Sequence, residues 1–72
     1  MSALKICTEV AGTVWKIVAA PGAALAAGEV ILIMESMKME IPVEAPRAGK
    51  LVELRVAEGD VLEEGDAVAL IE

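Results

Sequence analysis

The sequence contains two copies of one pattern, and this internal repeat constrains the fold more than any other feature. Residues 12–35 align without gaps to residues 49–72. Three glycines recur at a constant spacing of 37 residues, as the pairs Gly12 and Gly49, Gly22 and Gly59, and Gly28 and Gly65. Two copies are too few for a solenoid, which needs about three or more stacked repeats to bury its core. We therefore expect the copies to pack on each other as pseudo-symmetric halves of a single domain over residues 1–72.

Hydrophobic alternation in the second copy predicts a strand, and the alignment extends this strand to the first copy. Residues 50–56 alternate with a period of two, which is typical of a half-buried strand. We expect the inward set to be Val52, Leu54 and Val56, matched in the first copy by Trp15, Ile17 and Ala19. Alanine propensity favours a helix over residues 20–29. The aligned residues 57–66 instead place glycines on both sides of a very short apolar step, which predicts turn, strand and turn in both copies.

The two copies and their flanks together predict an all-β chain of about eight short strands, joined mostly by glycine or proline turns. The expected strands are 3–8, 12–19, 24–26, 30–36, 39–44, 49–56, 61–63 and 67–72. Strands of this number and length favour two four-stranded antiparallel sheets that pack as a flattened barrel or sandwich. The repeat predicts pseudo-two-fold symmetry between the sheets.

Composition excludes several classes of function. A net charge of −6 and a single aromatic residue, Trp15, argue against a nucleic-acid partner. The chain has no histidine, so the common zinc sites and the Ser-His-Asp triad are excluded. Acidic pairs such as Glu63 and Glu64 lie beside glycine, where a solvated turn is expected, and they lack the alternating ligands of a calcium loop. We expect no metal site and no catalysis by the chain itself.

Three features of the sequence predict a cytoplasmic location without a membrane partner. No unbroken apolar run is longer than that of Val30–Met34, which is far shorter than the roughly 20 residues of a membrane helix. No targeting peptide is recognisable at the N-terminus. The lone cysteine, Cys7, cannot form an internal disulfide and fits a reducing compartment. We expect Cys7 to serve as a small packing residue.

The segment ESMKME, residues 35–40, breaks the local rules of the repeat. Residues 30–36 and 39–44 are expected to form adjacent strands, which leaves Met37 and Lys38 as a two-residue hairpin tip. Such tips favour Asn-Gly or Asp-Gly, which tolerate a positive φ, so Met-Lys is poor turn chemistry. A local rule that is broken without structural benefit often marks a functional site. A solvated lysine with no function is the simpler alternative, and spacing alone does not exclude it.

The residues ESMKMEIPV, 35–43, resemble the attachment motif of biotinyl domains, in which the lysine between two methionines is biotinylated. The glycine turns, the tip midway along the chain and the chain length extend the resemblance over nearly all 72 residues. The chain is similar in particular to the small free-standing biotin carboxyl carrier proteins, also called biotin/lipoyl attachment proteins. The resemblance implies the hammerhead fold of biotinyl and lipoyl domains. One departure is Pro-Gly-Ala at residues 21–23 in place of an acidic Glu-Gly-Asp turn, which we expect to change surface charge rather than the fold.

The resemblance also implies a cofactor and a set of partners. Biotin would be joined by an amide to the Lys38 amine by a biotin protein ligase, through a biotinyl-adenylate. Met37, Met39 and Glu35 would contribute to recognition by this ligase. The biotin would then act as a swinging arm that carries carboxylate between a biotin carboxylase and a carboxyltransferase, with the partner enzymes forming and breaking the bonds. The implied assembly is an acyl-CoA-type carboxylase, such as acetyl-CoA carboxylase in fatty acid biosynthesis.

Two alternatives stay open at the level of the sequence. A lipoyl carrier shares the fold, but lipoyl domains typically have Asp-Lys-Ala where this chain has Met37, Lys38 and Met39. An unmodified structural module would leave Lys38 without any cofactor. The intact mass of the protein from its native cell distinguishes biotin, lipoate and an unmodified lysine.

Overall fold

The computed structural model of the chain describes residues 3–72, which form eight β-strands and no helix. The strands are β1 (Leu4–Cys7), β2 (Gly12–Ile17), β3 (Ala24–Leu25), β4 (Val30–Ser36), β5 (Met39–Glu44), β6 (Gly49–Leu54), β7 (Val61–Leu62) and β8 (Ala67–Ile71). Every strand lies within the range predicted for it from the sequence. Because residues 3–72 contain no helix, none of them forms a helix that could cross a membrane.

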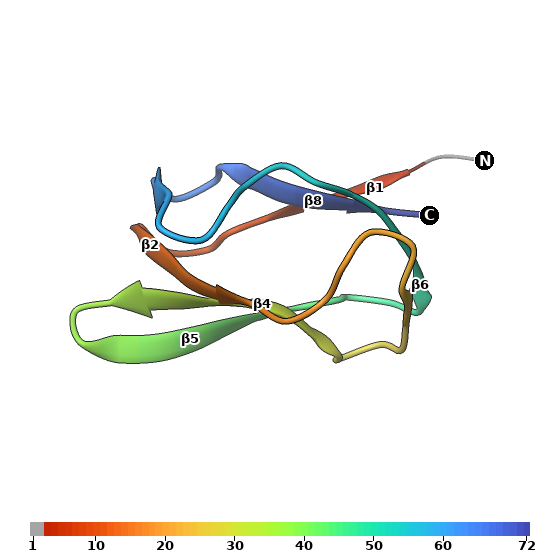
Figure 1. The fold of residues 1–72 in the computed structure, drawn as a ribbon, viewed down its shortest axis with the longest axis horizontal. Coiled ribbons are helices and arrows are strands. Elements are labelled where there is room, and N and C mark those ends of the chain that lie inside the picture. Colours follow the sequence, from red (N-terminus) through yellow and green to blue (C-terminus); the bar gives the residue numbers. More distant parts are fainter. Residues whose placement is uncertain (1–2) are drawn as a thin grey trace.

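Two four-stranded antiparallel sheets pack face to face (Figure 1). The first sheet has the strand order β1-β8-β6-β3, and the second has the order β5-β4-β2-β7. The molecule measures 36 × 17 × 17 Å, and the β4–β5 hairpin forms one end of its long axis. The predicted all-β sandwich of two four-stranded sheets is confirmed.

Strand pairing follows the same plan in the two sheets. In the second sheet Val14 on β2 pairs with Met34 on β4, and in the first sheet Leu51 on β6 pairs with Ile71 on β8. β4 continues through a hairpin into β5, whereas β8 pairs with β1, which comes from the opposite end of the sequence. The place of the hairpin in one sheet is thus taken in the other by two strands without a direct connection.

Four turns of one geometry join the short strands β3 and β7 to their neighbours. Each turn closes with a hydrogen bond of 3.0–3.1 Å from the amide of its fourth residue to the carbonyl of its first. The third residue is a glycine with φ between +86° and +95°, namely Gly22, Gly28, Gly59 or Gly65. This is the pattern of a type II turn, which favours glycine at that position. In the Pro-Gly-Ala turn the amide of Ala23 still donates to the carbonyl of Ala20, so this departure from the acidic turn leaves the backbone intact.

Two β-bulges overturn part of the predicted inward set. The strand register shifts at Trp15 on β2 and at Val52 on β6. A bulge places two residues opposite one and so interrupts the inward–outward alternation of the strand. The side chains of Trp15 and Val52 therefore turn outward, and their exposed fractions are 49% and 45%. Val14 and Leu51 are buried in their place. The other predicted inward residues do pack on the core, namely Ile17, Ala19, Leu54 and Val56.

Every strand contributes at least one buried apolar side chain to the core between the sheets. The largest fully buried apolar side chains are those of Ile31, Leu32, Met34, Leu51 and Ile71. Thr8 is the buried polar residue of the described chain, and its hydroxyl donates to the Val10 carbonyl at 2.9 Å and accepts from the Val10 amide at 3.3 Å. Cys7 is exposed, so the expectation that it serves as a small packing residue is wrong. It follows the buried Ile6 on an edge strand, where alternate side chains point to solvent.

Candidate functional site

The β4–β5 hairpin ends in a two-residue turn formed by Met37 and Lys38. Their φ angles are +52° and +66°, and Ser36 pairs with Met39 directly below them. Two consecutive positive φ angles are characteristic of a type I′ turn, whose twist matches that of the flanking strands. Each non-glycine residue in this left-handed region costs roughly 1–2 kcal/mol. The fold therefore keeps the turn in a conformation that its own side chains disfavour.

The strands below the turn hold it in this conformation. β4 and β5 stay paired up to Ser36 and Met39. On the other side of β4, β2 approaches the end of the strand at Gly12. A Cβ atom at Gly12 would collide with the carbonyl oxygen of Glu35 and would lie 3.2 Å from the Cβ of Ser36. This close approach requires glycine, and it braces the hairpin immediately below its tip.

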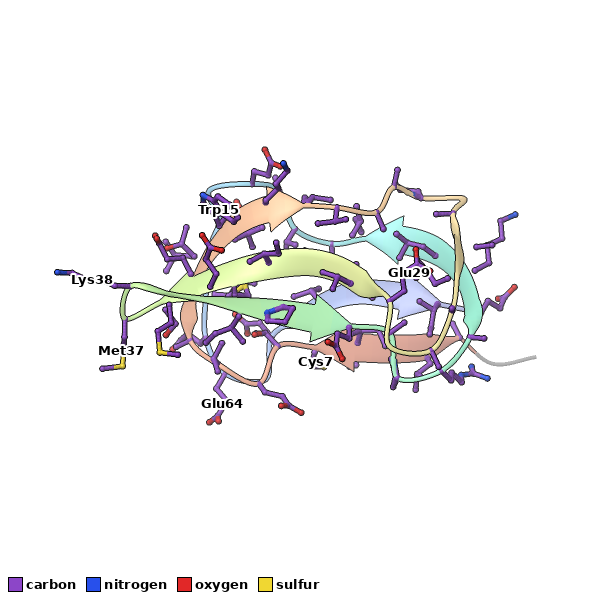
Figure 2. The ribbon with its side chains drawn as sticks, turned by 90° about the horizontal axis from the view of Figure 1, so that it is seen from below. Cys7, Trp15, Glu29, Met37, Lys38 and Glu64 are labelled. Atoms are coloured by element: carbon purple, nitrogen blue, oxygen red, sulfur yellow. The ribbon has the colours of Figure 1, made fainter. Side chains whose placement is uncertain are left out.

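The Lys38 side chain projects from the end of the molecule into solvent (Figure 2). The one ion pair among residues 3–72 joins Arg55 to Glu53, so the Lys38 amine has no carboxylate partner in this part of the chain. An amine that is neither buried nor paired is accessible to a modifying enzyme. The structure thus places the predicted attachment residue where a second protein can reach it.

The methionines on either side of Lys38 are exposed although they are apolar. The exposed fraction is 92% for Met37 and 63% for Met39, whereas Met34 on the same hairpin is fully buried. Met37 points to the side of the molecule opposite Trp15 (Figure 2). Exposed apolar side chains at a strained turn contribute little to folding, which makes them candidates for contact with a partner.

Two glutamates face each other across the strands below the tip. Glu35 on β4 is the direct neighbour of Glu40 on β5, and both are exposed. Like charges in directly opposite positions destabilise a sheet, so this pair does not serve the fold. The sequence motif predicts Glu35 at the site but not Glu40. The pairing of Glu35 with Glu40 could have been predicted too, because a two-residue turn at residues 37–38 fixes which residues of the two strands lie opposite each other. The hairpin brings together all the residues predicted for the site, namely Glu35, Met37, Lys38 and Met39.

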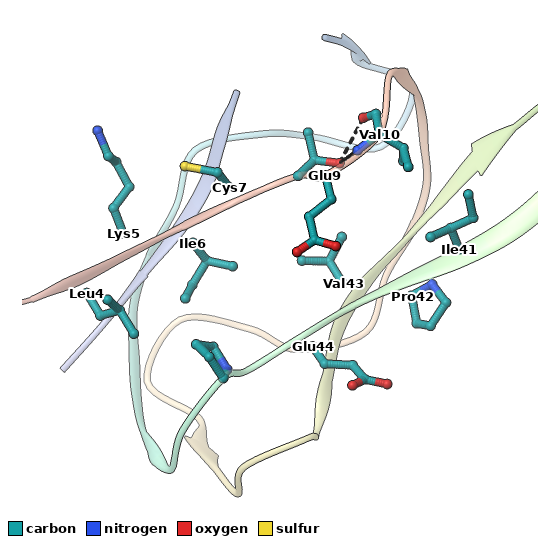
Figure 3. Close-up of a pocket in the computed structure, with 12 residues that line it drawn as sticks. Leu4, Lys5, Ile6, Cys7, Glu9, Val10, Ile41, Pro42, Val43 and Glu44 are labelled. Carbon is teal, nitrogen blue, oxygen red and sulfur yellow. Dashed lines mark hydrogen bonds between the residues drawn. The ribbon is translucent and has the colours of Figure 1, made fainter. Parts of the chain in front are cut away.

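A separate cavity of about 360 Å³ lies between the edge strands β1 and β5 (Figure 3). Ile6 and Val43 point into it, while Lys5 and Cys7 point away from the interior. Lys38 does not line this cavity. Within residues 3–72, no group of three or more acidic or cysteine side chains is placed to bind a metal ion. The hairpin tip, rather than the cavity, is therefore the candidate site.

Comparison with known proteins identifies relatives along the whole described chain. A family model described as biotin-requiring enzyme matches residues 3–71. The biotin/lipoyl attachment protein of Bacillus subtilis is 38% identical over 65 residues, which cover 90% of this chain and 89% of the relative. The urea carboxylase of Kluyveromyces lactis has a TM-score of 0.95 and 39% identity over 100% of this chain. A single-chain, multi-domain long-chain acyl-CoA carboxylase has a TM-score of 0.91 and 32% identity over 96% of this chain.

The relatives differ greatly in length. The chain spans only 6% of the urea carboxylase and 7% of the acyl-CoA carboxylase, but nearly the whole of the bacterial attachment protein. The resemblance found in the sequence and the biotin cofactor that it implies are confirmed at the level of the family. The chain belongs to the family of biotin-requiring enzymes, as an attachment domain of the type found in biotin-dependent carboxylases.

Proposed function

We propose that the chain carries biotin on Lys38 and presents it to partner enzymes. The observation that carries this proposal is the position of Lys38, exposed and without an ion-pair partner in the described chain, at the end of a strained but well-braced hairpin. A primary amine in this position fits the attachment of a carboxylic-acid cofactor as an amide. The match to the biotin-requiring family supports biotin as that acid.

The attachment step uses the Lys38 amine as its nucleophile. Inside the ligase the amine loses a proton and attacks the acyl carbon of an activated biotin carboxylate. The amide bond forms as the bond to the leaving group breaks. Because the turn extends beyond the body of the sandwich, the ligase can enclose Lys38 without unfolding any strand. Met37 and Met39 are exposed on either side of Lys38, and Glu35 lies on the same hairpin one residue pair below Ser36 and Met39. In this proposal all three residues contact the ligase.

After attachment, biotin supplies the group that accepts carboxylate, and the chain supplies its position. A covalent tether makes each delivery intramolecular, with an effective concentration in the millimolar range for short flexible links. Because β4 and β5 are paired up to Ser36 and Met39, we expect the motion to be that of the lysine arm. The proposed partners are a biotin carboxylase and a carboxyltransferase of an acyl-CoA-type carboxylase. The similarity to an acyl-CoA carboxylase supports this class, and the similarity to a urea carboxylase makes an assembly of that kind the alternative. A cytoplasmic location stays a prediction, with which the free thiol of Cys7 is compatible.

Replacing Lys38 tests the proposed attachment site directly. Arginine keeps the charge and approximate length, but its guanidinium stays protonated and cannot attack an acyl group. We expect Lys38→Arg to take up no biotin when incubated with biotin ligase, ATP and biotin, as measured by intact mass. Its free energy of unfolding should change by no more than about 0.5 kcal/mol, because the tip is solvated.

Lys16→Arg is the matched control for this experiment. Lys16 is also exposed, but it lies on β2 within the sheet. We expect this variant to be biotinylated like the wild type. Biotin on a folded Lys38→Arg protein would refute the assignment of the site. A mass increase that corresponds to lipoate in protein from the native cell would instead support a lipoyl carrier.

A further inference from the structure

The methionines of the described chain differ sharply in their access to solvent. Met34 is fully buried in the core, whereas Met37 and Met39, the direct neighbours of Lys38, are exposed. Oxidation of a thioether depends on exposure of its sulfur. An oxidant in solution therefore reaches the two methionines at the tip and not the one below it. Among residues 3–72, accessible thioethers are confined to the proposed attachment site.

We propose that Met37 and Met39 form a reversible oxidation site that controls the loading of biotin on Lys38. This inference rests on the proposed function and adds regulation to it. The oxidant is a peroxide. One oxygen of hydrogen peroxide is transferred to the thioether sulfur as the O–O bond breaks, the sulfur loses two electrons, and the other oxygen leaves as water. The products are methionine sulfoxide and water, and a methionine sulfoxide reductase reverses the change.

The physical effect of the oxidation falls on recognition rather than on folding. A sulfoxide converts a flexible apolar side chain into a polar one with a strong hydrogen-bond acceptor. A ligase surface that buries the thioethers of Met37 and Met39 would have to bury this acceptor without a partner. The cost of an unpaired buried polar group corresponds to a loss of roughly fivefold or more in the specificity constant for loading. In the free protein both side chains lie in solvent, so the sandwich itself should not be affected.

The experiment uses the full chain with Cys7→Ser, because the exposed thiol of Cys7 also reacts with peroxide. The protein is treated with hydrogen peroxide, the peroxide is removed, and loading by biotin ligase is measured as kcat/KM. Tandem mass spectrometry assigns each oxygen to a residue. We expect one added oxygen on Met37 and one on Met39, none on Met34, an unchanged circular dichroism spectrum, and loading that falls roughly fivefold or more. Treatment with methionine sulfoxide reductases should restore loading.

The control variant carries Met37→Leu and Met39→Leu in the same Cys7→Ser background. Leucine has a similar volume but cannot be oxidised. Whatever its own untreated rate, this variant should load equally well before and after peroxide. Equal loading of the oxidised and untreated methionine protein would overturn the inference, and so would an equal loss in the leucine variant. If the untreated protein takes up no biotin at all, the proposed carrier function fails, and the regulation that rests on it fails too.

Discussion

The chain has two halves with the same order of strands, residues 4–35 and residues 41–72. Only the first half leads directly into the hairpin tip at Met37 and Lys38. In the first half, pairing of β4 continues beyond Met34 to Ser36, which pairs with Met39 across the turn. In the second half, the matching pairs end where Ile71 on β8 meets Leu4 on β1. The candidate site lies on the direct β4–β5 connection, whose counterpart among residues 3–72 is the unconnected pair β8 and β1. The difference shows that the repeated scaffold does not itself specify the site, which depends on the short segment that joins the halves.

The halves also differ in charge. The first half contains two basic and three acidic residues, and the second contains three basic and eight acidic residues, so their net charges are −1 and −5. Several of the extra acids lie in turns, where Asp60 accepts a hydrogen bond from the amide of Ala57 at 2.9 Å. The matching turn has Ala23 in this position and still closes. The turn backbone therefore does not require the carboxylate.

The largest expected effect tests the bulges, which are placed identically in the two halves. Leu51→Ala removes a fully buried side chain from the core and should lower the free energy of unfolding by about 2–5 kcal/mol. Val52→Ala, one residue further along, should cost less than about 1 kcal/mol because its side chain points outward. Urea denaturation of both variants measures the difference. Equal losses would show that β6 has no bulge in solution.

The next effect compares two turns that correspond in the halves. Gly22 and Gly59 both have φ of +95°, and neither has an atom within 4 Å of the position that a Cβ would take. Alanine at either site therefore meets backbone strain rather than a collision. We expect Gly22→Ala and Gly59→Ala each to cost more than about 1 kcal/mol, and by similar amounts. Thermal melts of both variants check this, and tolerance of alanine at both sites would contradict the shared turn geometry.

A smaller effect tests the acidic turn of the second half. Asp60→Ala removes the acceptor for the Ala57 amide, and we expect it to cost about 0.5–1 kcal/mol, since the bond is exposed to water. Asp60→Asn keeps a side-chain oxygen in place and is the control, with most of the stability retained. Chemical denaturation distinguishes the two. A loss well above this range for Asp60→Ala would mean that the acid has a role that Ala23 does not need in the first half.

The smallest effect concerns the tip, for which the second half has no counterpart. Asparagine tolerates the left-handed region better than other non-glycine residues. Met37→Asn should therefore raise the free energy of unfolding, by at most about 1 kcal/mol. We expect biotin loading of the same variant to fall, so that stability and loading change in opposite directions. Loading that stays at the wild-type rate would show that the ligase does not use Met37.

Much of the fold follows from the sequence, because glycine turns and the alternation of apolar and polar residues are signals carried by short segments of the chain. The eight strands and the position of the tip at Met37 and Lys38 agree with the structure. The orientation of Trp15 and Val52 could not be predicted, since a bulge depends on how a strand pairs with its neighbour rather than on its own alternation. The exposure of Cys7 was likewise out of reach, because it depends on the position of β1 at the edge of a sheet.

β1 begins and β8 ends where Leu4 pairs with Ile71, on the side of the molecule opposite the β4–β5 hairpin (Figure 1). This placement has a consequence for how the domain can be built into larger proteins. A polypeptide fused at Leu4 or Ile71 would extend from the end of the molecule that is farthest from Lys38. We expect that a linker on that side can be lengthened, shortened or attached to a large neighbour without covering Lys38. The elongated shape of the domain thus separates its covalent connections to neighbouring polypeptide from the proposed attachment site.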